Sequence, residues 1–185
     1  MNRHSRSTRA LVEAALMIAL ATILGYFRLY RFPQGGSVDF AMVPILIYCL
    51  RWGPAWSLSC CFVNGVLQFF LGGGIALSWQ SMLLDYLAAF TPLGLAGLFK
   101  GRTWGIFAGT VVGCAGRFLV HYISGVTIYK ILVPTAFMNW TFTSPSFYSI
   151  VYNGSYMLPN TVIALAIAAL LYKPMKRYIL GQDIQ

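Results

Sequence analysis

The chain has 185 residues, of which 58% are hydrophobic and only 9% are charged, and its mean hydropathy is +0.70. A soluble globular domain carries about 25% charged residues, so this composition excludes a soluble domain and indicates an integral membrane protein. Membrane topology explains the net charge of +9 better than a nucleic-acid partner does, because the lysines and arginines stand at the ends of apolar segments.

Six apolar segments follow one another along the chain. A spanning helix needs about 20 mostly apolar residues, and the segments that reach or approach this length cover residues 11–27, 38–50, 54–71, 82–99, 104–127 and 147–172. The second segment is short, so it is expected to be tilted, partly re-entrant, or to begin earlier in the loop before it. The sequence therefore predicts an all-α membrane protein with six transmembrane helices, forming a single domain over residues 1–185.

The basic residues predict the orientation of these spans. With the N-terminus inside, the inner side receives Arg3, Arg6, Arg9, Arg51, Lys100, Arg102, Lys173, Lys176 and Arg177, and the outer loops receive Arg28, Arg31 and Lys130. Positive charge concentrates in cytoplasmic loops. Both termini are therefore predicted to be cytoplasmic, which places most of the unusual polar residues in the outer half of the membrane, where an outward-facing solute pocket would need them.

The first span carries two pairs of small residues at helical spacing. Ala10 and Ala14 form one pair, and Ala15 and Ala19 form the other. Small residues four apart let another helix approach closely. The two uses left open are packing within the bundle and docking to a partner subunit.

Two carboxylates fall within or beside apolar spans. Asp85 lies in the fourth, where a carboxylate costs roughly 2.5 kcal/mol or more at the membrane centre and usually faces a partner or a cavity. With Tyr86 it could present a carboxylate and a phenol to a ligand; the alternative is a structural ion pair, with Arg117 as first candidate. Asp39 opens the second span, where it could contact a ligand or cap the helix through the macrodipole.

Arg117 and His121 are four residues apart and share one face of the fifth span. Arg117 is expected to pair with an acid or with backbone carbonyls. His121 could stack on or hydrogen-bond a heteroaromatic ring, or it could be satisfied within the helix bundle.

The start of the last span and the loop before it are rich in aromatic residues. An interfacial aromatic belt and a ring-walled pocket for an organic cation both use such residues, which are Tyr129, Trp140, Tyr148, Tyr152 and Tyr156, and Trp79 before the fourth span allows the same two interpretations. Asn153 is harder to assign to a belt, because an amide at membrane depth needs partners.

No catalytic, metal or cofactor motif is present. The sequence has no GxxxxGK(S/T), HExxH, GxSxG or CxxC pattern, so the chain is not expected to be an enzyme or to hydrolyse ATP itself. The four cysteines fall within apolar runs and are interpreted as small packing residues. Six short spans without an energy source look incomplete for active transport.

These residues resemble a known family. The chain is similar to the thiamine-specific substrate-binding S components (the ThiT/YuaJ family) of energy-coupling factor (ECF) transporters over the stretches 33–37, 84–86, 94–99, 117–126 and 148–157. The resemblance implies a six-helix subunit of the bacterial cell membrane. It would capture its solute outside and dock on an ECF transmembrane subunit that works with two ATPases.

The resemblance also implies roles for individual residues. The family's acidic residue and tyrosine fall on Asp85 and Tyr86, its pocket histidine on His121, its last-helix residues on Tyr148 and Asn153, its second-helix acid on Asp39, and its docking motif on Ala15 and Ala19. Tyr129 stands where the family often has tryptophan. Gly35, Asn64 and Ile75 stand where some members have aromatic residues, and Trp140, in a long loop over 129–146, could supply a lost ring.

The resemblance favours a thiamine-binding subunit, and three alternatives stay open. The same architecture could take a related ring compound such as pyridoxine or hydroxymethylpyrimidine. An independent vitamin facilitator would move its solute without ATPase partners. A membrane enzyme using Asp85, Arg117 and His121 would leave an altered product.

Overall fold

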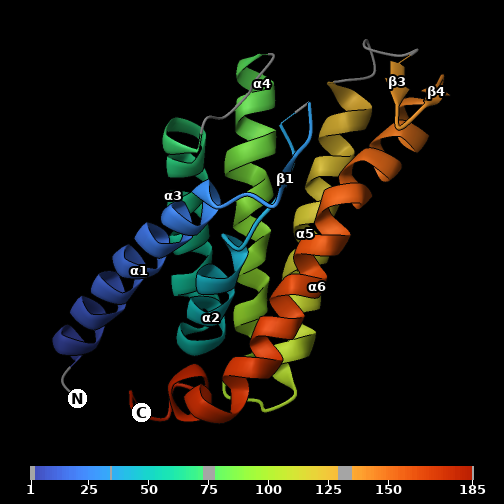
Figure 1. The fold of residues 1–185 in the computed structure, drawn as a ribbon. Helices are drawn as coiled ribbons and strands as arrows, with labels where there is room; N and C mark the ends of the chain where they lie inside the picture. The colour runs from blue at the N-terminus through green and yellow to red at the C-terminus, as the bar shows by residue number, and fades with distance from the viewer. Residues whose placement is uncertain (1–2, 34, 73–77, 129–134, 185) are drawn as a thin grey trace.

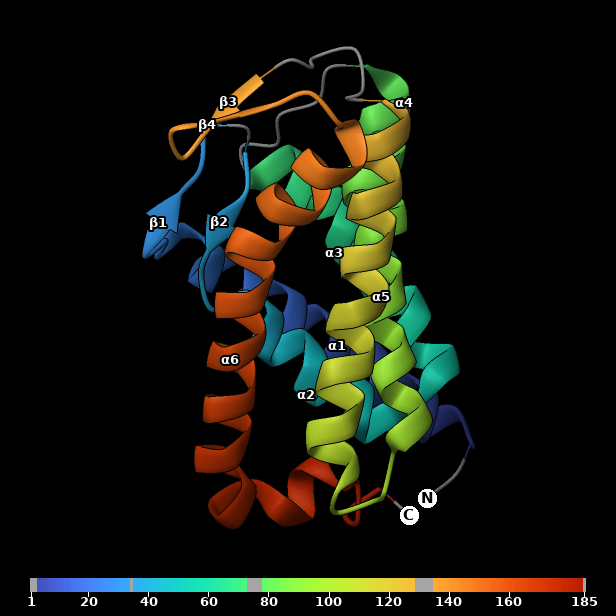
Figure 2. The same cartoon turned by 90° about the vertical axis from the view of Figure 1, so that its right-hand side faces the viewer.

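Helices make up most of the structure, a computed structural model that describes residues 3–33, 35–72, 78–128 and 135–184 (Figure 1). The elements are α1 (Arg3–Tyr26), α2 (Met42–Trp52), α3 (Pro54–Leu71), α4 (Trp79–Met82), the π-helical turn η1 (Leu83–Ala88), the 3-10 helix η2 (Thr91–Phe99), α5 (Gly105–Thr127) and α6 (Pro145–Ile179). Both termini lie at one end of the bundle, called the termini end below (Figures 1 and 2).

Five helical stretches are long and apolar enough to cross a membrane. Within the described residues they are His4–Tyr26, Pro54–Leu71, Trp79–Phe99, Gly105–Thr127 and Pro145–Ile179. The remaining predicted span, the second, overlaps the shorter helix α2, whose 11 residues rise only about 16 Å, against a hydrocarbon core of about 30 Å. These five candidate membrane helices overlap five of the six predicted segments, and α1 and α6 extend beyond the predicted bounds.

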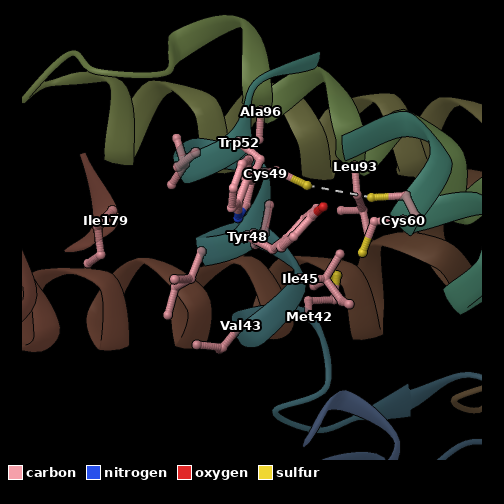
Figure 3. Packing of buried hydrophobic residues seen from close by; sticks show 14 of the residues in the cluster. Met42, Val43, Ile45, Tyr48, Cys49, Trp52, Cys60, Leu93, Ala96 and Ile179 are labelled. Carbon is pink, nitrogen blue, oxygen red and sulfur yellow. Dashed lines mark hydrogen bonds between the residues drawn. The ribbon is translucent and has the colours of Figure 1, made fainter. Parts of the chain in front are cut away.

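Helix α2 is buried on every side. All 11 of its residues are buried, and its side chains pack against α3, η2 and α6 (Figure 3). The Tyr48 hydroxyl donates to the carbonyl of Ala10 on α1 at 3.1 Å, and the sulfurs of Cys49 and Cys61 lie 3.6 Å apart. Because α2 is surrounded by protein, it needs no lipid-length apolar face, which explains why the sequence shows only a short segment here.

The predicted start of the second span at residue 38 is wrong. Residues Ser37–Val38 form strand β2, which pairs antiparallel with β1 (Tyr30–Arg31), and the helix begins at Met42. A second hairpin, β3 (Thr135–Phe137) with β4 (Trp140–Phe142), lies in the loop before α6. The all-α prediction therefore holds for the bundle but missed two hairpins in its connections.

The fourth span is helical throughout but is not a regular α-helix. After α4 the chain widens into η1 and then tightens into η2. A Cβ atom at Gly94 would lie 2.8 Å from the backbone nitrogen of Leu58, and one at Gly97 would lie 2.7 Å from the backbone carbon of Gly53. These glycines therefore let η2 pack directly on α3. Asp85 lies within the π-helical turn η1. Single π-helical turns of this kind are common at functional sites.

The termini end is closed by a cluster of charged side chains. Arg51 is 0% exposed and bonds both Glu13 (Nε to Oε2, 2.6 Å) and Asp183 (Nη2 to Oδ2, 2.9 Å). Arg9 also pairs with both carboxylates, and the indole of Trp52 donates to Glu13 at 2.7 Å. This cluster connects α1 and α2 to the segment that follows α6.

Candidate functional site

A cavity of about 140 Å³ lies in the half of the bundle away from the termini. It is lined by residues from α1, the β1–β2 hairpin, α3, η1, α5 and α6. Six of the seven predicted ligand-binding residues line it, namely Asp39, Asp85, Tyr86, His121, Tyr148 and Asn153. The seventh, Tyr129, lies outside the described residues, as does Ile75. The structure thus brings together residues that are far apart in the sequence.

Asp85 faces α5 from the π-helical turn. Its Oδ2 accepts a hydrogen bond from the Ser81 hydroxyl at 3.0 Å, and its Oδ1 lies 3.5 Å from Nδ1 of His121. The expected candidate partner, Arg117, instead places its guanidinium carbon 3.9 Å from the centre of the Phe90 ring. Asp85 therefore meets an imidazole and a hydroxyl at the edge of the cavity.

His121 links Asp85 to Arg117. The Arg117 Nε donates to His121 Nε2 at 3.4 Å, so Nε2 is the acceptor and the ring proton is assigned to Nδ1, which faces Asp85. A neutral imidazole in this tautomer satisfies both neighbours. The predicted face-sharing of Arg117 and His121 is confirmed, and the arrangement orients the His121 ring toward the cavity, edge-on to Tyr156 at 6.1 Å.

Asn153 has the partners that an amide at membrane depth requires. Its Nδ2 donates to the carbonyl and the hydroxyl of Ser149 at 2.9 and 3.1 Å, and its Oδ1 accepts from the Tyr156 hydroxyl at 2.7 Å. The amide is therefore held in one orientation beside the cavity. A solute bond to Asn153 must share these atoms or replace a partner.

The tyrosines of α6 form a row that faces inward. Tyr148 and Tyr152 are stacked with ring centres 5.7 Å apart, and Tyr152 meets Tyr156 edge-on at the same distance. All three are buried, so the aromatic-belt interpretation is wrong for them. Trp79 and Trp140 are 66% and 65% exposed, as a belt would require, and neither belongs to the described lining of the cavity.

The β1–β2 hairpin is fastened to α6 over the cavity. The Gly36 amide donates to the Tyr152 hydroxyl at 3.0 Å, while Asn160 donates to the carbonyl of Ser37 at 2.7 Å and accepts from the amide of Asp39 at 2.9 Å. A Cβ atom at Gly36 would lie 2.5 Å from the Tyr156 ring, so only glycine fits there. Sequence reasoning missed Asn160, although it stands seven residues after Asn153 and so on nearly the same helix face.

Asp39 lies in the turn before α2 rather than in the helix. Its Oδ1 accepts from the amide of Ala41 at 2.9 Å, and its Oδ2 accepts from the Ser37 hydroxyl at 2.6 Å. The carboxylate thus orders the turn that leads into α2 and also lines the cavity, whereas the N-cap of α2 is Ala41, without a side-chain bond, so the capping interpretation is wrong.

The two small-residue pairs of α1 face different ways. Ala10 is fully buried in the bundle, where α2 packs against it, whereas Ala15 and Ala19 are exposed on the outer face of α1. The first pair serves internal packing. The second pair lies on a surface that also carries Leu16 and Leu20 and that another helix could contact.

Comparison with known proteins assigns a family. Residues 11–180 match the family model described as thiamine transporter protein (Thia_YuaJ). Thiamine transporter ThiT of Bacillus subtilis (strain 168) is 31% identical over 97% of this chain and 97% of its own, and thiamine transporter ThiT of Lacticaseibacillus paracasei is 26% identical over 99% and 96%.

A solved structure has the same fold. The structure of ThiT from Listeria monocytogenes superposes with a TM-score of 0.82, covers 94% of this chain and 98% of its own, and is 22% identical in sequence. Membership of a transporter family argues against the membrane-enzyme alternative. The family match over residues 11–180 and the relative at 31% identity lead to one conclusion: the chain belongs to the Thia_YuaJ family of thiamine transporter proteins.

Proposed function

We propose that this protein is the substrate-binding S subunit of an ECF-type importer and captures thiamine from outside the cell. The observation that carries the proposal is the cavity, which gathers a carboxylate, a phenol, an imidazole and an amide among aromatic rings. Ligand sites are typically concave and largely apolar, with a few convergent polar groups. The thiamine transporter family gives the ligand its identity.

Thiamine is a permanent cation that carries an aminopyrimidine ring, and the cavity suits both features. Asp85 supplies negative charge and accepts hydrogen bonds, and Tyr86 and Asn153 fix the pyrimidine edge. The rings of His121 and Tyr148 pack on the ligand, as aromatic faces do against organic cations. Tyr129, outside the described residues, is proposed to add a further ring.

The energy source is proposed to lie in partner subunits. The exposed Ala15 and Ala19 on α1 support docking on an ECF transmembrane subunit, which two ATPases would serve. The bias of basic residues toward the termini end supports an orientation with both termini inside and the cavity facing out. The expected location is the bacterial cell membrane, with the helices in contact with lipid.

Ligand identity is tested by mass spectrometry of small molecules that co-purify with the protein, followed by calorimetric titration with thiamine, pyridoxine and hydroxymethylpyrimidine. Thiamine is expected to co-purify and to bind most tightly. Preferred binding of either other ring compound would refute thiamine specificity, and solute movement in liposomes without ATPase partners would refute the S-subunit assignment.

A further inference from the structure

One wall of the cavity is polar and has no role in the binding scheme above. It is built where α1 and α3 end, and Gly25, Arg28, Gln68 and Gly72 line it. Helices α1 and α3 lie on one side of the bundle, and α5 and α6, which carry His121 and Asn153, lie on the other (Figure 1). The cavity therefore has two chemically distinct sides.

Gln68 brings an unused donor to this wall. Its Nε2 is buried and has no hydrogen-bond partner among the described residues. Gly72 leaves room for the amide, because a Cβ atom there would lie 2.7 Å from Gln68 Oε1, whereas one at Gly25 would make ordinary contact with Nε2 at 3.7 Å. A buried donor without an acceptor is costly to keep, so such a group beside a cavity points to an acceptor that arrives with a ligand.

Arg28 brings a positive charge to the same wall. Its Nε donates to the carbonyl of Gly25 at 3.0 Å and its Nη2 to the carbonyl of Gly72 at 2.6 Å, so the guanidinium is held across the ends of α1 and α3. Within the described part of the chain no carboxylate forms an ion pair with it. Its charge is thus directed to carbonyl oxygens and to the cavity.

We propose that Gln68 and Arg28 form a second subsite, which takes an oxygen acceptor of the bound solute while Asp85 takes its cationic portion. This inference rests on the proposed function. Thiamine carries a hydroxyethyl group, and its phosphate esters carry their phosphate on that same oxygen. Either a hydroxyl or a phosphate oxygen would supply the acceptor that Gln68 lacks, and a phosphate would also use the charge of Arg28.

The test compares three ligands on the full-length protein by calorimetric titration: thiamine, an analogue in which the hydroxyethyl group is replaced by ethyl, and thiamine monophosphate. Gln68→Leu is expected to lower the affinity for thiamine roughly tenfold, the worth of one hydrogen bond, and to leave the affinity for the ethyl analogue unchanged.

Arg28→Gln distinguishes the two acceptors. If the subsite takes phosphate, this variant should lower the affinity for thiamine monophosphate more than the affinity for thiamine. If the subsite takes the hydroxyl alone, both affinities should change by the same factor.

Controls separate this subsite from folding and from the proposed function. Gln80→Leu makes the same replacement at an exposed glutamine of α4 and should change no affinity. Gln68→Leu removes an unpaired buried donor, so the melting temperature of the ligand-free protein should not fall. The subsite is refuted if Gln68→Leu changes the affinities for thiamine and its ethyl analogue by one common factor, or changes neither. Absence of thiamine binding by the unmodified protein would refute the proposed function instead.

Discussion

The four acidic residues divide equally between the two ends of the molecule, and their partners differ. At the termini end, Glu13 and Asp183 are both bonded by the guanidinium groups of Arg9 and Arg51. At the cavity end, Asp39 accepts from a hydroxyl and a backbone amide. Asp85, which also lines the cavity, meets a hydroxyl and an imidazole.

The difference indicates two uses of a buried carboxylate. A network in which each charge has an opposite charge fixes packing, and removal of one member leaves another uncompensated. The hydroxyl, amide and imidazole contacts described at the cavity end orient a carboxylate without cancelling its charge, so it can still attract a cation. The termini end is therefore interpreted as structural and the cavity end as ligand-binding.

The largest expected effect is at Arg51. Arg51→Met leaves Glu13 and Asp183 without their buried partner, and breaking such a pair costs about 3–5 kcal/mol. The melting temperature of the purified protein should fall strongly, while the thiamine affinity of the folded fraction should stay within about twofold, because the two ends are far apart. Arg9→Gln is the matched control. The Arg9 side chain is 37% exposed, so its replacement should lower the melting temperature less than Arg51→Met does. An equal fall in melting temperature in both variants would contradict a network centred on the buried Arg51.

The next effect is expected at Asn160, which fastens the β1–β2 hairpin over the cavity. Asn160→Ala removes its bonds to Ser37 and Asp39, worth about 1–2 kcal/mol together. Thiamine should dissociate faster and bind roughly 5- to 30-fold more weakly, as measured by calorimetry and stopped-flow fluorescence. Thr161→Ala, whose hydroxyl donates to the carbonyl of Met157 in its own helix and which does not line the cavity as described, should bind thiamine normally. An unchanged dissociation rate in Asn160→Ala would show that the hairpin contributes nothing to retention.

The smallest expected effect is the pH response of the termini end. The hydrogen bond from Arg51 holds the pKa of Asp183 well below its ordinary value. A depressed pKa means that the ionised carboxylate stabilises the folded state at neutral pH, and that this contribution is lost as pH falls below the ordinary value of about 3.9. Asp183→Asn should therefore melt lower than the unmodified protein at pH 7, and the gap should narrow in acid. A gap that is constant with pH would exclude this linkage.

The sequence predicted the bundle and the main cavity residues because these features depend on local signals. Long apolar runs mark the spans. A carboxylate inside such a run, as at Asp85, stands out because burying its charge in the membrane costs free energy. The start of α2 could not be predicted, because Val38, Phe40 and Ala41 extend the apolar run toward the N-terminus although they lie outside the helix. Asn160 and Gln68 were missed because their roles depend on what the fold places opposite them: the hairpin in one case and the cavity in the other.

The most direct test neutralises one carboxylate at each end without changing its shape. Asp85→Asn and Glu13→Gln are compared by thiamine calorimetry and by melting temperature without ligand. Asp85→Asn should lose roughly 100-fold or more in thiamine affinity while it melts like the unmodified protein, and Glu13→Gln should melt lower while it binds thiamine normally. Undiminished thiamine affinity in Asp85→Asn would contradict the assignment of the cavity as the thiamine site.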